Sequence, residues 1–134
     1  MPVEKKATKY KKSPLKKKEL EYFRKIIVDK LAKSEDQLDR MKKRFVDAQE
    51  DASSVSAYSM HMADLGTDNM EKEKLSLMIA RETKYIGYLR RALERIDNKT
   101  YGICKVTGHA IAKERLEAVP HTEISIKAKL AQSK

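Results

Sequence analysis

The residues whose types and spacing point most clearly to chemistry lie near the carboxyl-terminal end of this 134-residue chain. Four positions have the spacing of a C-x2-C-x17-C-x2-C zinc knuckle, and their residues are Cys104, Thr107, Ser125 and Ala128. A structural zinc ion needs four Cys or His ligands, whereas these positions offer one thiol, two hydroxyls and a methyl group. The pattern therefore predicts a knuckle without zinc, in which Thr107 and Ser125 can hydrogen-bond and Ala128 and Cys104 can pack.

A metal site of another kind is an open alternative. His109 and His121 could join Cys104 as ligands, but their spacing does not match the knuckle positions, and three ligands would give an open site. A catalytic nucleophile would need a His–acid pair, and Cys104 has none at a recognisable spacing. We therefore expect no metal, no cofactor and no enzymatic activity.

Two segments with heptad spacing precede the knuckle. From Ser13-Pro14, where Ser can cap a helix and Pro fits its first turn, mostly apolar residues recur at alternating steps of four and three, as far as about Ala52. This seam consists of Leu20, Arg24, Ile27, Leu31, Ser34, Leu38, Met41, Phe45 and Ala48. The spacing predicts one long helix with a coiled-coil stripe.

A second helix is predicted after a Ser-rich loop. Gly66-Thr67-Asp68 can start it, with Thr67 as the cap, and Asn98 and Gly102 mark its end. Its seam consists of Leu75, Ile79, Glu82, Ile86, Leu89, Leu93 and Ile96. Two such helices bury their stripes by folding back on each other. The predicted fold class is therefore all-α, a long antiparallel coiled-coil hairpin with a small zinc-finger-like cap.

These patterns divide the chain into three parts. Residues 1–13 are expected to be a flexible basic tail, residues 14–99 the hairpin with its tip loop at about 53–67, and residues 100–134 the cap, with a last helix near 122–132. The cap has too few apolar residues for a core of its own, so it should pack on the base of the hairpin.

The net charge of +10 is unevenly distributed. Residues 1–18 carry eight lysines and one glutamate, whereas residues 47–73 carry seven acids and one lysine. The basic segment is either a disordered solubilising arm or an arm that contacts nucleic acid or an acidic protein groove. A single cysteine is typical of a reducing compartment. No apolar run is long enough for a membrane span or a signal peptide, so we expect a cytoplasmic protein.

The knuckle and its surroundings carry an ordered set of further residues. They are the Tyr101-Gly102-Ile103-Cys104 turn, Gly108, Ile111, the run Arg115-Leu116-Glu117-Ala118-Val119-Pro120, and Lys129. This set resembles the zinc-finger region of the DksA/TraR family of bacterial transcription factors, and the resemblance extends over roughly residues 19–130. It implies a regulator of the stringent response that binds RNA polymerase and inserts its coiled-coil tip into the secondary channel, where it modulates initiation.

The resemblance also implies a working end at the hairpin tip. The family has a D-x-x-D-x-A signature there that reaches toward the catalytic magnesium of the polymerase. In this sequence Asp64 matches the second Asp, His61 stands at the first, and Gly66 replaces Ala. Asp68, one turn further on, can compensate. Members of the family also bind guanosine tetraphosphate, which makes the alarmone a candidate effector here. Its contacts would be Arg81, Arg115 and Lys129, whose positions are often basic in the family.

Two other functions are compatible with the sequence. The first is a nucleic-acid-binding protein that acts through residues 1–18, whose DNA binding should weaken steeply with added salt in the absence of polymerase. The second resembles the Gre factors, with Asp64 and Asp68 offered to a second magnesium to promote transcript cleavage. A cleavage assay on stalled transcription complexes would distinguish it.

Overall fold

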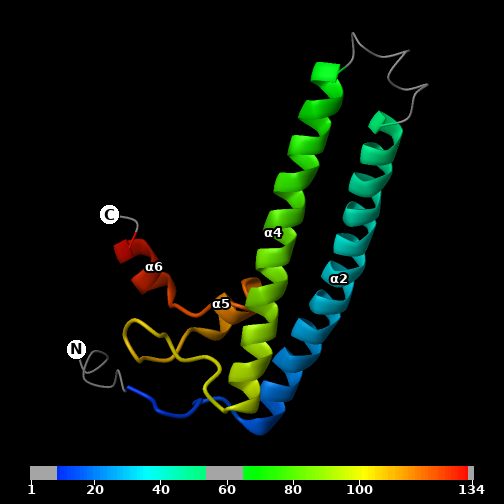
Figure 1. Ribbon diagram of the computed structural model, residues 1–134. Helices are drawn as coiled ribbons and strands as arrows, with labels where there is room; N and C mark the ends of the chain where they lie inside the picture. The colour runs from blue at the N-terminus through cyan, green and yellow to red at the C-terminus, as the bar shows by residue number, and fades with distance from the viewer. Residues whose placement is uncertain (1–8, 54–64, 133–134) are drawn as a thin grey trace. The chain divides into compact units, whose positions relative to one another are not determined.

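The computed structural model describes residues 9–53 and 65–132 of the chain. Within these ranges the chain forms helices and turns, with a single isolated antiparallel bridge between Ile103 and Ala110. The helices are α2 (Lys17–Ser53), α4 (Leu65–Asp97), α5 (Lys113–Ala118) and α6 (Ile126–Gln132) (Figure 1). The predicted class is confirmed, because α2 and α4 form a long helical hairpin and residues 100–132 form a small cap.

The chain divides into two compact units. The first comprises Met1–Leu31 and Gly87–Lys134, which hold the base of the hairpin and the cap. The second comprises Ala32–Ile86, which holds the remaining parts of the two hairpin helices. None of the described helices is long and apolar enough to cross a membrane.

The predicted seams are the buried faces of the two helices. Every seam residue of both helices is buried or half-buried. In the first unit Ile27 and Leu89 are completely buried, and in the second unit Met41, Leu75 and Ile86 are the buried apolar residues. The heptad spacing therefore identified the surface by which each helix packs.

The start of α2 differs from the predicted start at Ser13-Pro14, because the helix begins at Lys17. The backbone N–H of Ser13 donates to the carbonyl of Lys99 at 2.6 Å, and the Ser13 hydroxyl accepts the N–H of Leu15 at 3.2 Å. These bonds hold Ser13 in a turn ahead of the helix. The capping acceptor is instead the carboxylate of Glu19, which accepts the N–H of Lys16 at 2.9 Å.

The start of α4 also differs from the prediction, since Leu65 is its first residue and Thr67 lies inside the helix instead of capping it. Its end was predicted correctly near Asn98, which follows the last helical residue, Asp97. Lys99 then adopts a left-handed conformation with φ 61°. This conformation commonly ends helices, although glycine usually occupies it.

The cap packs on the base of the hairpin, as predicted. Tyr101 and Leu116 are completely buried, and the Tyr101 ring lies 5.6 Å from the ring of Phe23 in α2, centroid to centroid. The hydroxyl of Tyr101 donates to the carbonyl of Pro120 at 2.7 Å. The short helix α5 was not predicted, and α6 lies within the predicted range 122–132.

Residues 9–15, which we call the strap, run along the cap. The N–H of Tyr10 donates to the carbonyl of Gly108 at 2.8 Å, in addition to the bond from Ser13 to Lys99. Both Gly108 and Gly102 have positive φ, and a Cβ added at Gly102 would lie 3.2 Å from the Leu15 side chain. Residues 9–13, expected to belong to the flexible tail 1–13, are therefore docked on the cap. Residues 1–8 lie outside the described residues.

Candidate functional site

The backbone of a zinc knuckle is present in the cap. The N–H of Cys104 donates to the carbonyl of His109 at 2.8 Å, and the N–H of Gly108 returns to the carbonyl of Cys104 at 2.7 Å. These bonds close a tight turn in which Gly108 has φ 76°. The second half of the knuckle starts α6, where the Ser125 hydroxyl accepts the N–H of Ala128 at 3.2 Å.

Three of the zinc-knuckle positions meet at Cys104, because Thr107 and Ser125 both interact with its thiol. Cys104 is completely buried and Ala128 is nearly so. Burial by itself would raise the pKa of the Cys104 thiol. Hydrogen bonds from the side chains and backbones of Thr107 and Ser125 outweigh burial and lower this pKa to about 6. The site therefore stabilises a thiolate through hydrogen-bond donors at the place where a zinc ion would bind one.

These residues do not fit a zinc ion. The hydroxyls of Thr107 and Ser125 are engaged with the sulfur of Cys104, and Ala128 offers only a methyl group. Among the described residues there is no group of three or more His, Cys, Asp or Glu side chains that could hold a metal. The alternative site formed by Cys104, His109 and His121 is therefore not assembled, and no step of the function is assigned to a metal.

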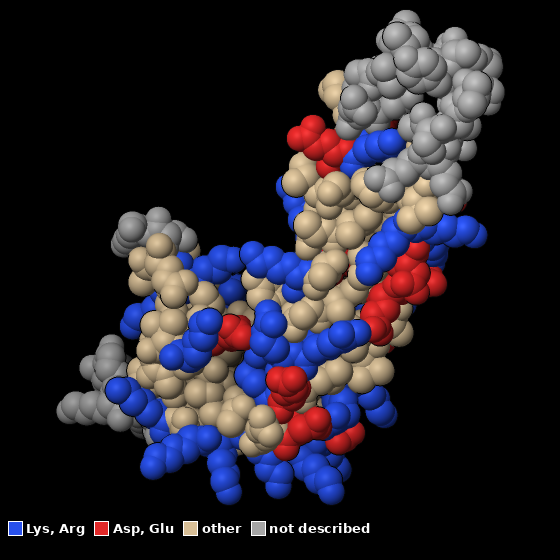
Figure 2. Space-filling model, viewed as in Figure 1, with Lys and Arg blue, Asp and Glu red and all other residues tan. Residues whose placement is uncertain are grey.

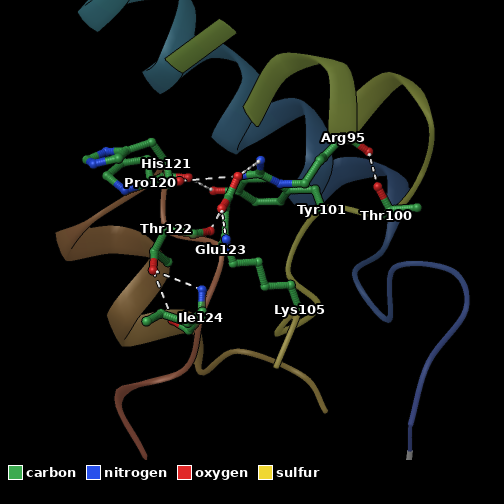
Figure 3. A network of polar contacts seen from close by, with 9 residues as sticks. All are labelled: Arg95, Thr100, Tyr101, Lys105, Pro120, His121, Thr122, Glu123 and Ile124. Carbon is green, nitrogen blue, oxygen red and sulfur yellow. Dashed lines mark hydrogen bonds and ion pairs between the residues drawn. The ribbon is translucent and has the colours of Figure 1, made fainter. Parts of the chain in front are cut away.

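A cluster of charged residues joins the parts of the cap to α4 (Figure 3). Arg95, in the last turn of α4, pairs with the carboxylate of Glu123 at 3.2 Å and donates to the carbonyls of His121 and Thr122 at 3.2 and 3.4 Å. The second oxygen of Glu123 accepts a hydrogen bond from Lys105 at 2.7 Å. We call Arg95, Lys105 and Glu123 the Arg95 cluster.

The Arg95 cluster is partly shielded from water. The Arg95 side chain is 20% exposed, and burial lowers its pKa despite the neighbouring Glu123. The hydrogen bond from Lys105 holds the pKa of Glu123 below its usual value. A second link between the two halves is the bond from the N–H of Lys105 to the carbonyl of Glu123 at 2.9 Å. The cluster therefore connects the two halves of the knuckle, which is the task a zinc ion performs in a zinc finger.

A surface pocket of about 440 Å³ lies beside the Arg95 cluster. Its walls include Arg115 and Lys129, two of the three residues predicted to contact phosphate. The third, Arg81, belongs to the other unit, Ala32–Ile86. Tyr88 and His121, which also line the pocket, stack with their ring centroids 5.8 Å apart. The pocket thus combines cations with an aromatic face.

The predicted tip residues are placed only in part. His61 and Asp64 lie outside the described residues, and Asp68 is in the first turn of α4. Neither the Arg95 cluster nor the Tyr88–His121 pair was predicted from the sequence. One signal was available for Arg95, because it immediately precedes the seam residue Ile96 and so borders the buried stripe.

Comparison with known proteins finds no matching family model. The uncharacterised protein YteA of Bacillus subtilis is 41% identical over 66 residues, which is 49% of this chain and 28% of that protein. General stress protein 16O of the same organism is 37% identical over 71 residues, 51% of this chain and 42% of the relative. The RNA polymerase-binding transcription factor DksA of Caulobacter vibrioides is 40% identical over 48 residues, 36% of this chain and 34% of the relative. The matches thus span less than half the length of these curated relatives.

Two solved structures share the fold. The transcription factor DksA2 from Pseudomonas aeruginosa superposes with a TM-score of 0.76 and 21% identity, covering 87% of this chain and 84% of that chain. The RNA polymerase binding protein and transcriptional regulator Dks from Chlamydia trachomatis gives a TM-score of 0.50 and 21% identity, covering 90% and 93%. The chain therefore has the DksA fold, a long helical hairpin with a small cap. Together with the sequence matches, this shared fold supports the resemblance of the chain to the DksA/TraR family.

Proposed function

We propose that this protein binds bacterial RNA polymerase directly and regulates transcription without catalysing a reaction. The observation that carries the proposal is the DksA2-like fold, which extends over 87% of the chain. It is supported by the 40% identity of a shorter segment to an RNA polymerase-binding transcription factor. The hairpin would enter the secondary channel of the polymerase as a probe, and the cap would anchor the protein at the channel rim.

The hairpin has dimensions suited to such a probe. The 37 residues of α2 span roughly 55 Å at 1.5 Å per residue. The base of the hairpin is fastened to the cap by several contacts, which would keep the anchor rigid. Lys113 of the cap pairs with Glu19, and Glu117 accepts a hydrogen bond from Tyr22 at 2.9 Å.

The tip would be the working end of the probe. Asp64 would bring a negative charge near the catalytic magnesium of the polymerase, with His61 and Asp68 beside it. A charge in a site of low dielectric acts more strongly than in water. The carboxylate of Asp64 would therefore change the electrostatics of the polymerase active site and with it the lifetime of open complexes.

The cap would supply the site of an effector. Arg115 and Lys129 line one pocket, and converging cations are what phosphate groups require. We therefore propose that guanosine tetraphosphate binds there against the polymerase, with Arg81 as a further contact. The cap would perform both tasks without zinc.

The test is a paired measurement on the isosteric variant Asp64→Asn. We expect this variant to compete for polymerase core like the wild type but to lose the effect on open-complex lifetime at a ribosomal-RNA-type promoter. The substitution removes charge but little contact area. Asp68→Asn is the matched control and should have a milder effect, because part of its role is to favour the start of the helix.

Two outcomes would contradict the proposal. If the wild type does not bind polymerase core, the proposed function fails as a whole. If Asp64→Asn binds and acts like the wild type, the hairpin tip is not the working end. Cleavage of the transcript in stalled complexes would instead indicate a function like that of the Gre factors.

A further inference from the structure

We propose that the strap and the first turn of α2 form a lysine-rich face that binds the phosphate backbone of double-stranded DNA. We call this face, Lys9 to Lys18 together with Lys99, the lysine face. It lies entirely within the first unit, and its binding to DNA would not require polymerase. This inference goes beyond the proposed function and can be tested without it.

The lysine face concentrates positive charge. Residues 9–18 contain six lysines and no acid, and all six lysines are exposed. Lys99, also exposed, adjoins them because its carbonyl accepts the N–H of Ser13. Figure 2 shows Lys and Arg side chains gathered along the lower edge of the molecule, where the strap meets the start of α2 in Figure 1.

The acids near this face are engaged with other residues. Glu19 pairs with Lys113, and Asp97 pairs with Arg24. Among the described residues, no lysine of the lysine face forms a salt bridge. Lys16 also attracts the carboxylate of Glu19, whose main partner is Lys113. The charge of the lysine face is therefore available to a partner.

Docking of the strap fixes the backbone that carries Lys9, Lys11 and Lys12. The N–H of Tyr10 donates to the carbonyl of Gly108 in the cap at 2.8 Å, and the N–H of Ser13 donates to the carbonyl of Lys99, just after α4, at 2.6 Å. The side chain of Leu15 packs against Gly102 and so anchors the strap on the cap. A preorganised set of charges loses less conformational entropy on binding than a disordered arm does, so this arrangement favours binding.

The arrangement has an electrostatic cost that an anion would relieve. Lys17 and Lys18 lie in the first turn of a 37-residue helix, and Lys16 directly precedes it. The dipole of a helix disfavours positive charge at this end, and neighbouring lysines repel one another. A polyanion laid across the face would remove both penalties.

The chemistry of the face favours a nucleic-acid backbone over an acidic protein. Protein interfaces rely on clusters of buried aromatic or apolar anchors, whereas Leu15 of the strap is turned onto the cap. Tyr10, which is 37% exposed, is the large apolar side chain that the strap presents to solvent. The cations are lysines without arginine. Lysine contacts phosphate as a point charge, and specific reading of bases usually depends on arginine. We therefore expect binding with little sequence preference.

The experiment measures binding of the full chain to a fluorescent 20-base-pair duplex of mixed sequence over a range of salt concentrations. The test variant is the double substitution Lys11→Gln and Lys12→Gln. The matched control is Lys42→Gln with Lys43→Gln, an equally exposed pair on α2 in the other unit. Loss of two phosphate contacts should weaken binding roughly tenfold and reduce the slope of log K against log salt by about 2. The control should bind like the wild type.

A second variant tests the docked strap separately from its charge. Tyr10→Pro removes the N–H that binds Gly108 and keeps every lysine, so we expect weaker binding with an unchanged salt slope. The proposal is overturned if the wild type does not bind the duplex or if the control weakens binding as much as the test variant. It is also overturned if polyglutamate binds as tightly as DNA, because the face would then suit acidic proteins.

Discussion

Cys104 lies in surroundings that favour the ionised form of its side chain. Its sulfur lies in a completely buried site and is surrounded by donors from Thr107 and Ser125. These donors favour the thiolate strongly enough to lower the pKa from its ordinary value of 9.0 to about 6, although burial opposes them. The sequence predicted that Thr107 and Ser125 would hydrogen-bond, but it could not predict their common partner, because that depends on how the two halves of the knuckle close.

The stability of the protein should therefore depend on the ionisation of Cys104. Because the folded pKa is below the unfolded pKa, the thiolate contributes its full stability above about pH 9 and none below about pH 6. We expect the free energy of unfolding to rise between these two values. The measurement is urea unfolding of the wild type and of Cys104→Ser, whose hydroxyl does not titrate. If the difference between them does not change with pH, the thiolate is not the folded form.

The seam of the hairpin makes a second prediction for a single residue. Leu89 is completely buried, so Leu89→Ala should lower the free energy of unfolding by about 2–4 kcal/mol. Leu77, on the same helix, is 58% exposed, and Leu77→Ala should change the free energy of unfolding by less than about 0.5 kcal/mol. Urea unfolding measures both variants. Equal effects would show that the seam is assigned to the wrong face.

At the scale of elements, the features predicted correctly from the sequence are those that depend on the periodic spacing of apolar residues. The two long helices and their buried faces follow from the heptad spacing, which acts along the whole length of each helix. The start of α2 was missed because the N–H of Ser13 bonds to Lys99, a residue far away in the sequence. The helix α5 was missed because it has only six residues and no side-chain cap at Ala112. Contacts between distant segments and very short helices leave little local signal.

The Arg95 cluster is the element-scale feature that periodicity could not identify. Arg95 bonds Glu123 and two carbonyls from a partly buried position. Arg95→Met should therefore destabilise the protein by about 2 kcal/mol, because buried acceptors lose a charged donor. Lys105 is 64% exposed, and Lys105→Met should cost less than about 1 kcal/mol. Thermal unfolding compares the two variants, and a larger loss for Lys105→Met would mean that the exposed pair holds the cap.

At the scale of the whole molecule, the strap ties the amino-terminal part of the chain to its carboxyl-terminal part. The hydrogen bond from Tyr10 to Gly108 joins a residue that precedes the hairpin in the sequence to one that follows it. Residues 1–13 were predicted to be a tail because they are rich in lysine and lack an apolar period. Composition describes the average behaviour of a segment, whereas docking here depends on two backbone N–H groups and on Leu15.

Removal of residues 1–12 tests the contribution of the strap to stability. The truncated chain should still unfold cooperatively, since α2, α4 and most of the cap are intact. We expect a loss of about 1 kcal/mol, because the bond from Tyr10 and the contact of Lys9 with Gly108 disappear. The control is removal of residues 1–8, which leaves this bond in place. Unchanged stability after the longer truncation would mean that the strap contributes nothing.

The burial of the chain's only thiol also allows opening of the cap to be measured by thiol labelling. Cys104 is completely buried and is the single cysteine of the sequence. A thiol reagent added to the native protein can react only with molecules whose cap has transiently opened. Comparing the labelling rate with the rate of global unfolding would separate local opening of the cap from unfolding of the hairpin. The kinetics of one chemical reaction would thus measure the lifetime of the closed cap, with no engineered probe.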